Sequence, residues 1–520
     1  MRAGLAAAGL LLGLALWPAG VAASGDGGCP PEWKLAAQQL SCVNRMVIGP
    51  GNDTRVNLLL LLRERAGLDG RGLAYARQDW PTIRGHALFE WGQLARALYP
   101  PAASADEYSY DPSDLSGSRC QSVRAGGEQF VAAVERNRVI PAGDRRALIE
   151  GRGKVLALCE AQAGRADEAA VSVADLELPR LYASREGREF GTYLAGAAAF
   201  YLEDWNGARS RFAALRTAKD PWLGETARYM GARAELNAAG ATAFDEWGSF
   251  DLAAADREAA ARAAAGFAAY LEAFPEGRYA QSAAGLVRRA LWLQGETGAL
   301  GAAYARMLEA VDGASPAAVE LVQEIDNKFL LAAGAGQATS GPWLLAAHDL
   351  LRMRLDGASG ESEFYDYRLS PLTAAELAAQ EAAFAGHGEL YDFVRANFAF
   401  YVEHDYRAVL RLLPDDARQP AYHPLPFSRQ VLRGLALAEL GDSNEAGFWL
   451  ELMGGAKGLH QRQTVELGLA LNWERAGQVA RVFEPGSPIE DEGVREVLLQ
   501  YAAGPEVLRA AAGLAGRPQR

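Results

Sequence analysis

Helical periodicity interrupted by a short turn is the clearest pattern along the chain. In residues 267–295, FAAYLEAFPEGRYAQSAAGLVRRALWLQG, apolar side chains recur every three or four positions on both sides of Pro275–Gly277. Proline and glycine this close together are typical of a turn. The pattern therefore predicts a helix over 267–274, a closing turn at Pro275 and a new helix over 279–293.

Two C-terminal segments match each other at an offset of 34 residues, from position 431 to position 465. They are VLRGLALAELGDSNEA (431–446) and VELGLALNWERAGQVA (465–480). A period of 34 residues is that of a repeated helix–turn–helix unit. The identical pairs are Val431/Val465, Gly434/Gly468, Leu435/Leu469, Ala436/Ala470, Leu437/Leu471 and Ala446/Ala480.

Small residues recur at the eighth and twentieth positions of this unit, where two helices approach closely and a larger side chain would push them apart. Gly434 and Gly468 fill the eighth position, and Ala446 and Ala480 fill the twentieth.

Three further copies are predicted. The first is at 193–221, where Gly196, Ala208 and Phe212 fall at positions eight, twenty and twenty-four. The second is at 399–416, where Ala408 matches Ala208, and the third is at 156–170, with Ala157, Gly164 and Ala169.

The period and the small residues resemble the tetratricopeptide repeat. The stretch Phe274-Pro275-Glu276-Gly277-Arg278-Tyr279-Ala280, with Ala283, is similar to the TPR-like repeats of bacterial envelope proteins, including the barrel-assembly lipoproteins and the coordinator of the Tol-Pal system. The chain departs from the assembly lipoprotein in its greater length and in having no lipobox. The resemblance implies an all-α fold, a TPR-like α-solenoid of antiparallel helix pairs, whose surface binds another envelope protein or a peptide.

The rest of the chain is expected to be helical between three connections at 102–118, 333–343 and 356–371, which are rich in Gly, Ser, Asp and Pro. Thr373 and Glu376 form the pattern of a capping box at a helix start, and five successive leucines in 57–65 predict a buried helix. The predicted organisation is a signal peptide (1–23), an N-terminal helical segment (24–110), TPR-like repeats (119–355) and C-terminal TPR-like repeats (372–520).

Residues 1–23 have the composition of a secretory signal peptide: Arg2, an apolar run from Leu5 to Trp17, and the small residues Val21-Ala22-Ala23 before the cleavage site. The alternative, a membrane anchor, would need a longer apolar run of about 20 residues. Removing Arg2 changes the formal net charge from −13 to −14. An acidic protein of this kind is expected to repel nucleic acid, and the high-GC bacterial composition favours the periplasm.

The four cysteines, Cys29, Cys42, Cys120 and Cys159, all lie in the first third of the chain. In an exported protein an even number of cysteines predicts two disulfides, although three pairings are possible. The alternative is that Cys159, within an apolar run, is a buried free thiol. The cysteines have no CxxC spacing and no nearby histidine, so a metal site is not expected.

The sequence contains none of the common catalytic or cofactor-binding motifs: no Walker loop, HExxH, GxSxG or SxxK. GRGKVL (151–156) lacks the third glycine of a dinucleotide fingerprint, and the six histidines contain no i, i+4 pair. No cofactor is expected. The first hypothesis is a non-enzymatic periplasmic scaffold in outer-membrane or cell-wall biogenesis. The alternative is an enzyme acting on peptidoglycan or polysaccharide, which a pair of buried carboxylates facing one cleft would favour.

Overall fold

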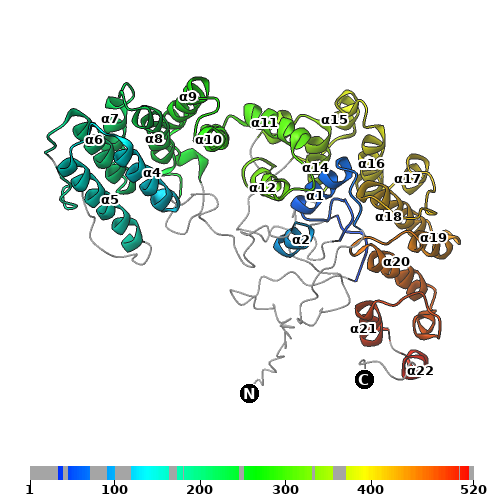
Figure 1. The fold of residues 1–520 in the computed structure, drawn as a ribbon. Helices are drawn as coiled ribbons and strands as arrows, with labels where there is room; N and C mark the ends of the chain where they lie inside the picture. The colour runs from blue at the N-terminus through cyan, green and yellow to red at the C-terminus, as the bar shows by residue number, and fades with distance from the viewer. Residues whose placement is uncertain are drawn as a thin grey trace, which may run out of the picture.

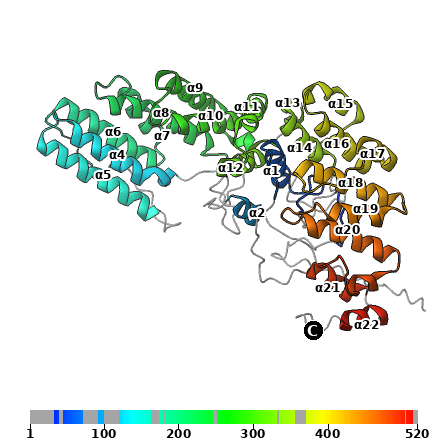
Figure 2. The ribbon, with the colours of Figure 1, turned by 45° about the vertical axis from the view of Figure 1, so that its right-hand side comes forward.

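The protein is all-α. The structure is a computed structural model that describes residues 33–38, 45–70, 91–99, 119–162, 173–179, 181–244, 251–330, 334–354, 370–502 and 504–513. These residues contain 21 α-helices, joined in places by short 3-10 or π-helical segments labelled η. The helices follow one another in chain order along an arc that begins at α4 and α5 and ends at α22 (Figures 1 and 2).

The first half of the arc contains α4 (Val123–Arg136), α5 (Ala142–Gln162), α6 (Arg185–Tyr201), α7 (Trp205–Ala214), α8 (Pro221–Gly240), α9 (Arg257–Ala273), α10 (Ala280–Gln294), α11 (Thr297–Ala310), α12 (Pro316–Ile325), α13 (Ala335–Ala338) and α14 (Pro342–Arg352). The second half contains α15 (Ala374–Ala379), α16 (Gly388–Phe398), α17 (Tyr406–Leu412), α18 (Pro424–Glu439), α19 (Glu445–Met453), α20 (Gln461–Arg475), α21 (Glu492–Tyr501) and α22 (Pro505–Gly513). The N-terminal segment adds α1 (Thr54–Arg65) and α2 (Trp91–Leu98).

Each helix of the arc packs mainly on its neighbours in the chain. Successive pairs are in contact from α4 to α12 and from α16 to α21, and alternate helices also meet: α6 with α8, α8 with α10, α14 with α16, α16 with α18, and α18 with α20. These alternate helices form two series, α6–α8–α10 and α14–α16–α18–α20, which we together call the inner layer. The helices between them, including α7, α9, α17 and α19, form an outer layer.

Short polar side chains start many of these helices. Asp204, Asp220, Asp256, Asp405 and Asp491 each accept a hydrogen bond from a backbone N–H of the first helical turn. The predicted capping box is confirmed, since Thr373 and Glu376 exchange hydrogen bonds at the start of α15.

The helix–turn–helix predicted around Pro275 is also confirmed. Helix α9 ends at Ala273 and α10 begins at Ala280, and Gly277 lies between them with its amide donating to the carbonyl of Phe274. A Cβ on Gly277 would lie 2.5 Å from the hydroxyl of Tyr270, so the turn leaves no room for a side chain there.

The expected match of Ala408 to Ala208 is wrong by one residue. Asp204 caps α7 and Asp405 caps α17, an offset of 201, whereas the preceding Phe200 and Phe400 differ by 200. The extra residue is absorbed by a π-helical segment, η5 (Ala399–Glu403), where α6 is still α-helical. The counterpart of Ala208 is therefore Val409, which like Ala208 is fully buried.

The N-terminal segment does not lie at the beginning of the arc. Helix α1 contacts α12, α14 and α18, and both views show it near the middle of the arc, where the two halves meet (Figures 1 and 2). Leu58 to Leu62 are all 0 % exposed, which confirms the buried helix predicted over 57–65. Consecutive buried residues mean that other parts of the protein surround α1 on all sides.

Hydrogen bonds between distant parts of the sequence hold this segment in place. The amide of Ile48 donates to Oγ of Ser428 at 2.9 Å, and the amide of Leu425 donates to Oε2 of Glu64 at 2.9 Å. Residues 45–65 thus pack where the two halves of the arc meet. In the described part of the chain, no helix is long and apolar enough to cross a membrane.

Candidate functional site on the inner layer

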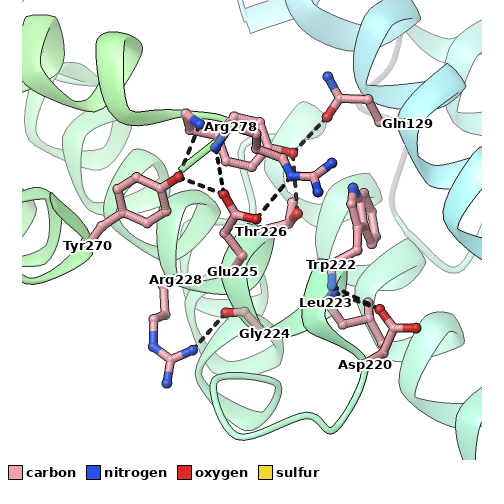
Figure 3. Close-up of polar contacts among 11 residues, drawn as sticks. Gln129, Asp220, Trp222, Leu223, Gly224, Glu225, Thr226, Arg228, Tyr270 and Arg278 are labelled. Carbon is pink, nitrogen blue, oxygen red and sulfur yellow. Dashed lines mark hydrogen bonds and ion pairs between the residues drawn. The ribbon is translucent and has the colours of Figure 1, made fainter. Parts of the chain in front are cut away.

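The carboxylate of Glu225 organises the polar contacts at the beginning of α8 (Figure 3). Its Oε1 accepts hydrogen bonds from the hydroxyl of Tyr270 at 2.9 Å and from the amide of Arg278 at 2.8 Å. Its Oε2 lies 3.1 Å from Nε of Arg278. One side chain of α8 therefore holds both α9 and the turn that leads into α10.

Tyr279, the aromatic residue at the head of α10, extends this network to other helices. Its hydroxyl donates to Oε1 of Gln129 at 2.8 Å and lies 3.2 Å from Oγ1 of Thr226. Its ring stacks on Tyr229 with centroids 4.3 Å apart. Gln129 belongs to α4, so Tyr279 connects two helices between which five others lie in the chain.

Burial raises the pKa of Tyr270 and the pKa of Tyr279 above the ordinary value of a phenol. Both hydroxyls therefore keep their protons at neutral pH and act as hydrogen-bond donors. This fits the geometry, because each donates to an oxygen acceptor on another helix.

Two arginines cover aromatic rings beside this network. The guanidinium of Arg233 lies 5.0 Å from the ring centroid of Phe200 and 5.8 Å from that of Tyr229. That of Arg152 lies 5.9 Å from Tyr201. Of these side chains, Tyr279, Gln129 and Arg233 are half-buried, and a hydroxyl, an amide and a guanidinium suit hydrogen bonding and stacking.

Gly434 and Gly468, the glycines at the eighth position of the two C-terminal copies, lie against the same side chain. Trp449, on α19, is 1 % exposed, and a Cβ on Gly434 of α18 would lie 2.4 Å from its Cη2. A Cβ on Gly468 of α20 would lie 2.8 Å from its Cε2. The indole is therefore inserted between two glycines of the inner layer.

The same arrangement occurs in the first half of the arc. Phe212 of α7 is 0 % exposed, and a Cβ on Gly196 of α6 would lie 3.0 Å from its ring, while a Cβ on Gly231 of α8 would lie 3.8 Å from its Cβ. In both places an aromatic side chain of the outer layer packs between glycines on the two flanking helices.

The structure places the remaining predicted packing residues in different surroundings. Ala208 is 0 % exposed, whereas Ala446 and Ala480 are half-buried. Pro275 is exposed at the turn.

Among the cysteines, only Cys120 has a described side chain, and it is not a free thiol. Cys29 and Cys42, and the side chain of Cys159, lie outside the described residues, so no disulfide between described residues is seen and the pairing stays a prediction.

Sequence reasoning missed Glu225 and Gln129, because a single carboxylate or amide on a helix has no distinctive spacing. It also missed two buried polar residues of α14, His348 and Asp349, although their position within the apolar run WLLAAHDLL was a signal. No group of three or more His, Cys, Asp or Glu among the described residues could hold a metal ion. No match to the chain was found among protein-family models, curated proteins or solved structures.

Proposed function

We propose that this chain is a periplasmic scaffold, a TPR-like α-solenoid that binds another envelope protein or a peptide in outer-membrane or cell-wall biogenesis. The observation that carries the proposal is the recurring insertion of an outer-layer aromatic between two inner-layer glycines. Phe212 packs between Gly196 and Gly231, and Trp449 packs between Gly434 and Gly468. The two glycines are separated by 35 residues (196 to 231) in one case and by 34 (434 to 468) in the other.

A second recurring contact supports the repeat. At the end of α6, Phe200 packs edge-on against Trp205, with ring centroids 5.8 Å apart. The corresponding Phe400 packs edge-on against Tyr406 at 5.1 Å. In both copies the contact closes the same helix–turn–helix, and an aspartate caps the following helix. Units that contact mainly their neighbours leave an extended surface for a binding partner.

Two buried carboxylates, Glu445 and Glu466, hold helices together, which favours the scaffold over the enzyme. Glu445 of α19 accepts hydrogen bonds from Asn472 and Arg475 of α20. Glu466 of α20 accepts hydrogen bonds from the amides of Glu490 and Asp491, where α21 begins. Buried carboxylates that accept hydrogen bonds from a neighbouring helix are expected in an array of packed helices.

The proposed compartment follows from the sequence. We propose that residues 1–23 direct export and are removed, and that Cys29, Cys42, Cys120 and Cys159 form two disulfides in the oxidising periplasm. The mature protein would then begin at Ser24. Its mass before and after reduction and alkylation tests both statements, because each disulfide opened adds two alkyl groups.

A photo-crosslinking amino acid placed on the inner layer tests the partner in the native host. Ser282 of α10 is exposed beside Tyr229, so a crosslinker at this position is expected to capture one dominant envelope protein, identified by mass spectrometry. Glu258, exposed on the outer-layer helix α9, is the matched control and is expected to capture none.

Equal capture at the two positions would contradict the proposal, because the inner layer would then have no preference for a partner. Capture of glycan in place of protein would favour the enzyme hypothesis, which digestion of purified cell wall by the exported protein would then test directly.

A further inference from the structure

Helix α14 buries three polar side chains in an otherwise apolar helix: His348, Asp349 and Arg352. His348 is 1 % exposed and Asp349 is 0 % exposed, and the helix is in contact with α1, α11 and α16. A buried ionised carboxylate is costly unless it is paired and hydrogen-bonded. The contacts of Asp349 therefore determine which protonation state the fold accepts.

Within the described part of the chain, the side chain of Asp349 makes one hydrogen bond, with Gln380 at the end of α15. Nε2 of Gln380 donates to Oδ1 of Asp349 at 3.2 Å. The other oxygen of each group, Oδ2 of Asp349 and Oε1 of Gln380, is buried and receives no hydrogen bond from the described part of the chain. An ionised carboxylate and an amide oxygen are both hydrogen-bond acceptors, so these two oxygens cannot form a hydrogen bond with each other.

We propose that Asp349 is a neutral carboxylic acid in the folded protein and that its Oδ2–H donates to Oε1 of Gln380, which makes the contact between α14 and Gln380 a proton-dependent latch. The second hydrogen bond uses one proton taken from solvent, and this proton returns to solvent when the carboxyl ionises. The two planar groups are then joined by two hydrogen bonds, and both unsatisfied oxygens gain a partner.

The charged side chains near Asp349 form hydrogen bonds or ion pairs with other groups. Arg352, one turn further along α14, donates to both carboxylate oxygens of Glu376 and to the carbonyls of Ser370 and Pro371. On α16, Tyr391 donates to the carbonyl of Leu377. The charged side chains of the elements packed on α14 are engaged elsewhere or exposed: Arg55 with Asp53, Arg63 with the carbonyl of Asp69, Glu64 with Leu425, Arg65 with carbonyls 309 and 311, Asp392 with Arg395, and exposed Arg306, Glu309, Glu381 and Glu389.

Electrostatics supports the same protonation state. Burial raises the pKa of Asp349 from its ordinary 3.8 to about 7, although Gln380 and Arg352 lower it in part. Burial, with Arg352, lowers the pKa of the neighbouring His348 from 6.5 to about 4, so the histidine is neutral when the carboxyl is neutral. The interior of α14 therefore carries no charge at either position near pH 6.

The latch connects three parts of the chain. Gln380 and Arg352 both hold the beginning of the second half, at Ser370–Gln380, to α14. Beyond α14, Arg354 donates to the carbonyl of Pro50 at 2.7 Å and so holds the N-terminal segment. Ionisation of Asp349 would leave a buried negative charge at this junction, and we expect the contact with Gln380 to loosen.

Asp349→Asn tests the proposal, because asparagine reproduces the protonated acid: its amide donates to Oε1 of Gln380 and its oxygen accepts from Nε2. Between about pH 4 and pH 7, Asp349 is protonated in folded wild-type protein and ionised in the unfolded chain. The stability that the neutral acid confers is therefore lost as pH rises through this window. The unfolding equilibrium constant of the wild type, relative to the variant, should rise by up to about tenfold per pH unit and become constant above about pH 8.

The contribution of His348 to stability has the opposite sign, because it increases with pH between about 4 and 6.5. Both proteins contain His348, so this contribution cancels when their stabilities are compared. Asp392→Asn, on α16, is the matched control and should leave the profile parallel to that of the wild type. A constant difference between wild type and Asp349→Asn across this pH range would overturn the proposal.

Infrared spectroscopy gives a second test that does not depend on unfolding. Wild-type protein at about pH 5 should show a carboxylic-acid C=O band that disappears at about pH 9. This contribution should be missing from Asp349→Asn and present in Asp392→Asn. If Asp349→Asn does not fold, the wild type alone still tests the proposal. A carboxylic-acid band that does not decrease between these two pH values would refute a neutral Asp349.

Discussion

Replacing Gly434 by alanine tests the packing that supports the repeat. The new Cβ would lie 2.4 Å from Cη2, 2.5 Å from Cζ2 and 2.9 Å from Cζ3 of Trp449. The ring has no free direction to move, because Gly468 lies against it on α20 and its Nε1 donates to Glu445 at 3.1 Å. The backbones of α18 and α19 must therefore separate.

The size of the effect follows from two opposing contributions. Overpacking a tight core costs typically about 1–3 kcal/mol, and the rigid indole between two glycines places this site near the upper end. Alanine in place of glycine within a helix recovers about 1 kcal/mol through higher helix propensity. We expect Gly434→Ala to lower the free energy of unfolding by about 2 kcal/mol.

Urea denaturation followed by circular dichroism measures this difference, and Gly447→Ala is the matched control. Gly447 lies on α19, is exposed, and a Cβ there would meet nothing within 4 Å. The control is therefore expected to stabilise the protein by about 0.5–1 kcal/mol. If Gly434→Ala were as stable as the wild type, the close approach of α18 to Trp449, and with it the repeat register, would be refuted.

Three further substitutions test separate contacts. Glu225→Ala removes the acceptor of Tyr270 and of a backbone amide, and should cost about 2 kcal/mol in urea denaturation, while Glu225→Gln should cost less. Ser428→Ala leaves the buried amide of Ile48 without its acceptor; it should cost about 1–3 kcal/mol and speed proteolysis near residue 48, and unchanged proteolysis would contradict the role of this anchor. Burial raises the pKa of Asp326 to about 6, so the stability that its neutral carboxyl confers should be lost between about pH 4 and 6; wild-type stability relative to that of Asp326→Asn should therefore fall across this window, and a constant difference would contradict the prediction.

Local pattern was sufficient to predict most helices because periodicity, caps and turns are properties of neighbouring residues. The turn at Pro275 and the capping box at Thr373 both depend on side chains within a few positions of each other. The one-residue displacement at η5 could also have been found in the sequence. Alignment of the capping residues Asp204 and Asp405, in place of the preceding aromatics, gives the offset of 201 directly.

The polar network could not be predicted because its members come from distant helices. Glu225 and Tyr270 are 45 positions apart, and Gln129 and Tyr279 are 150 apart. Nothing in the spacing of such residues distinguishes them from exposed polar residues on the same helices. The latch residues Asp349 and Gln380 are separated by 31 positions, and only burial shows that the carboxyl lacks water.

The location of the N-terminal segment changes where a partner of the proposed scaffold can bind. A solenoid read from periodicity alone would offer its whole inner layer, but residues 45–65 already pack on α18 of the second half through Ile48 and Glu64. Leu58 to Leu62 are fully buried there, so displacing this segment would expose a large apolar surface and is costly. The inner layer around Tyr279 and Arg233 in the first half is therefore the surface on which we expect a partner.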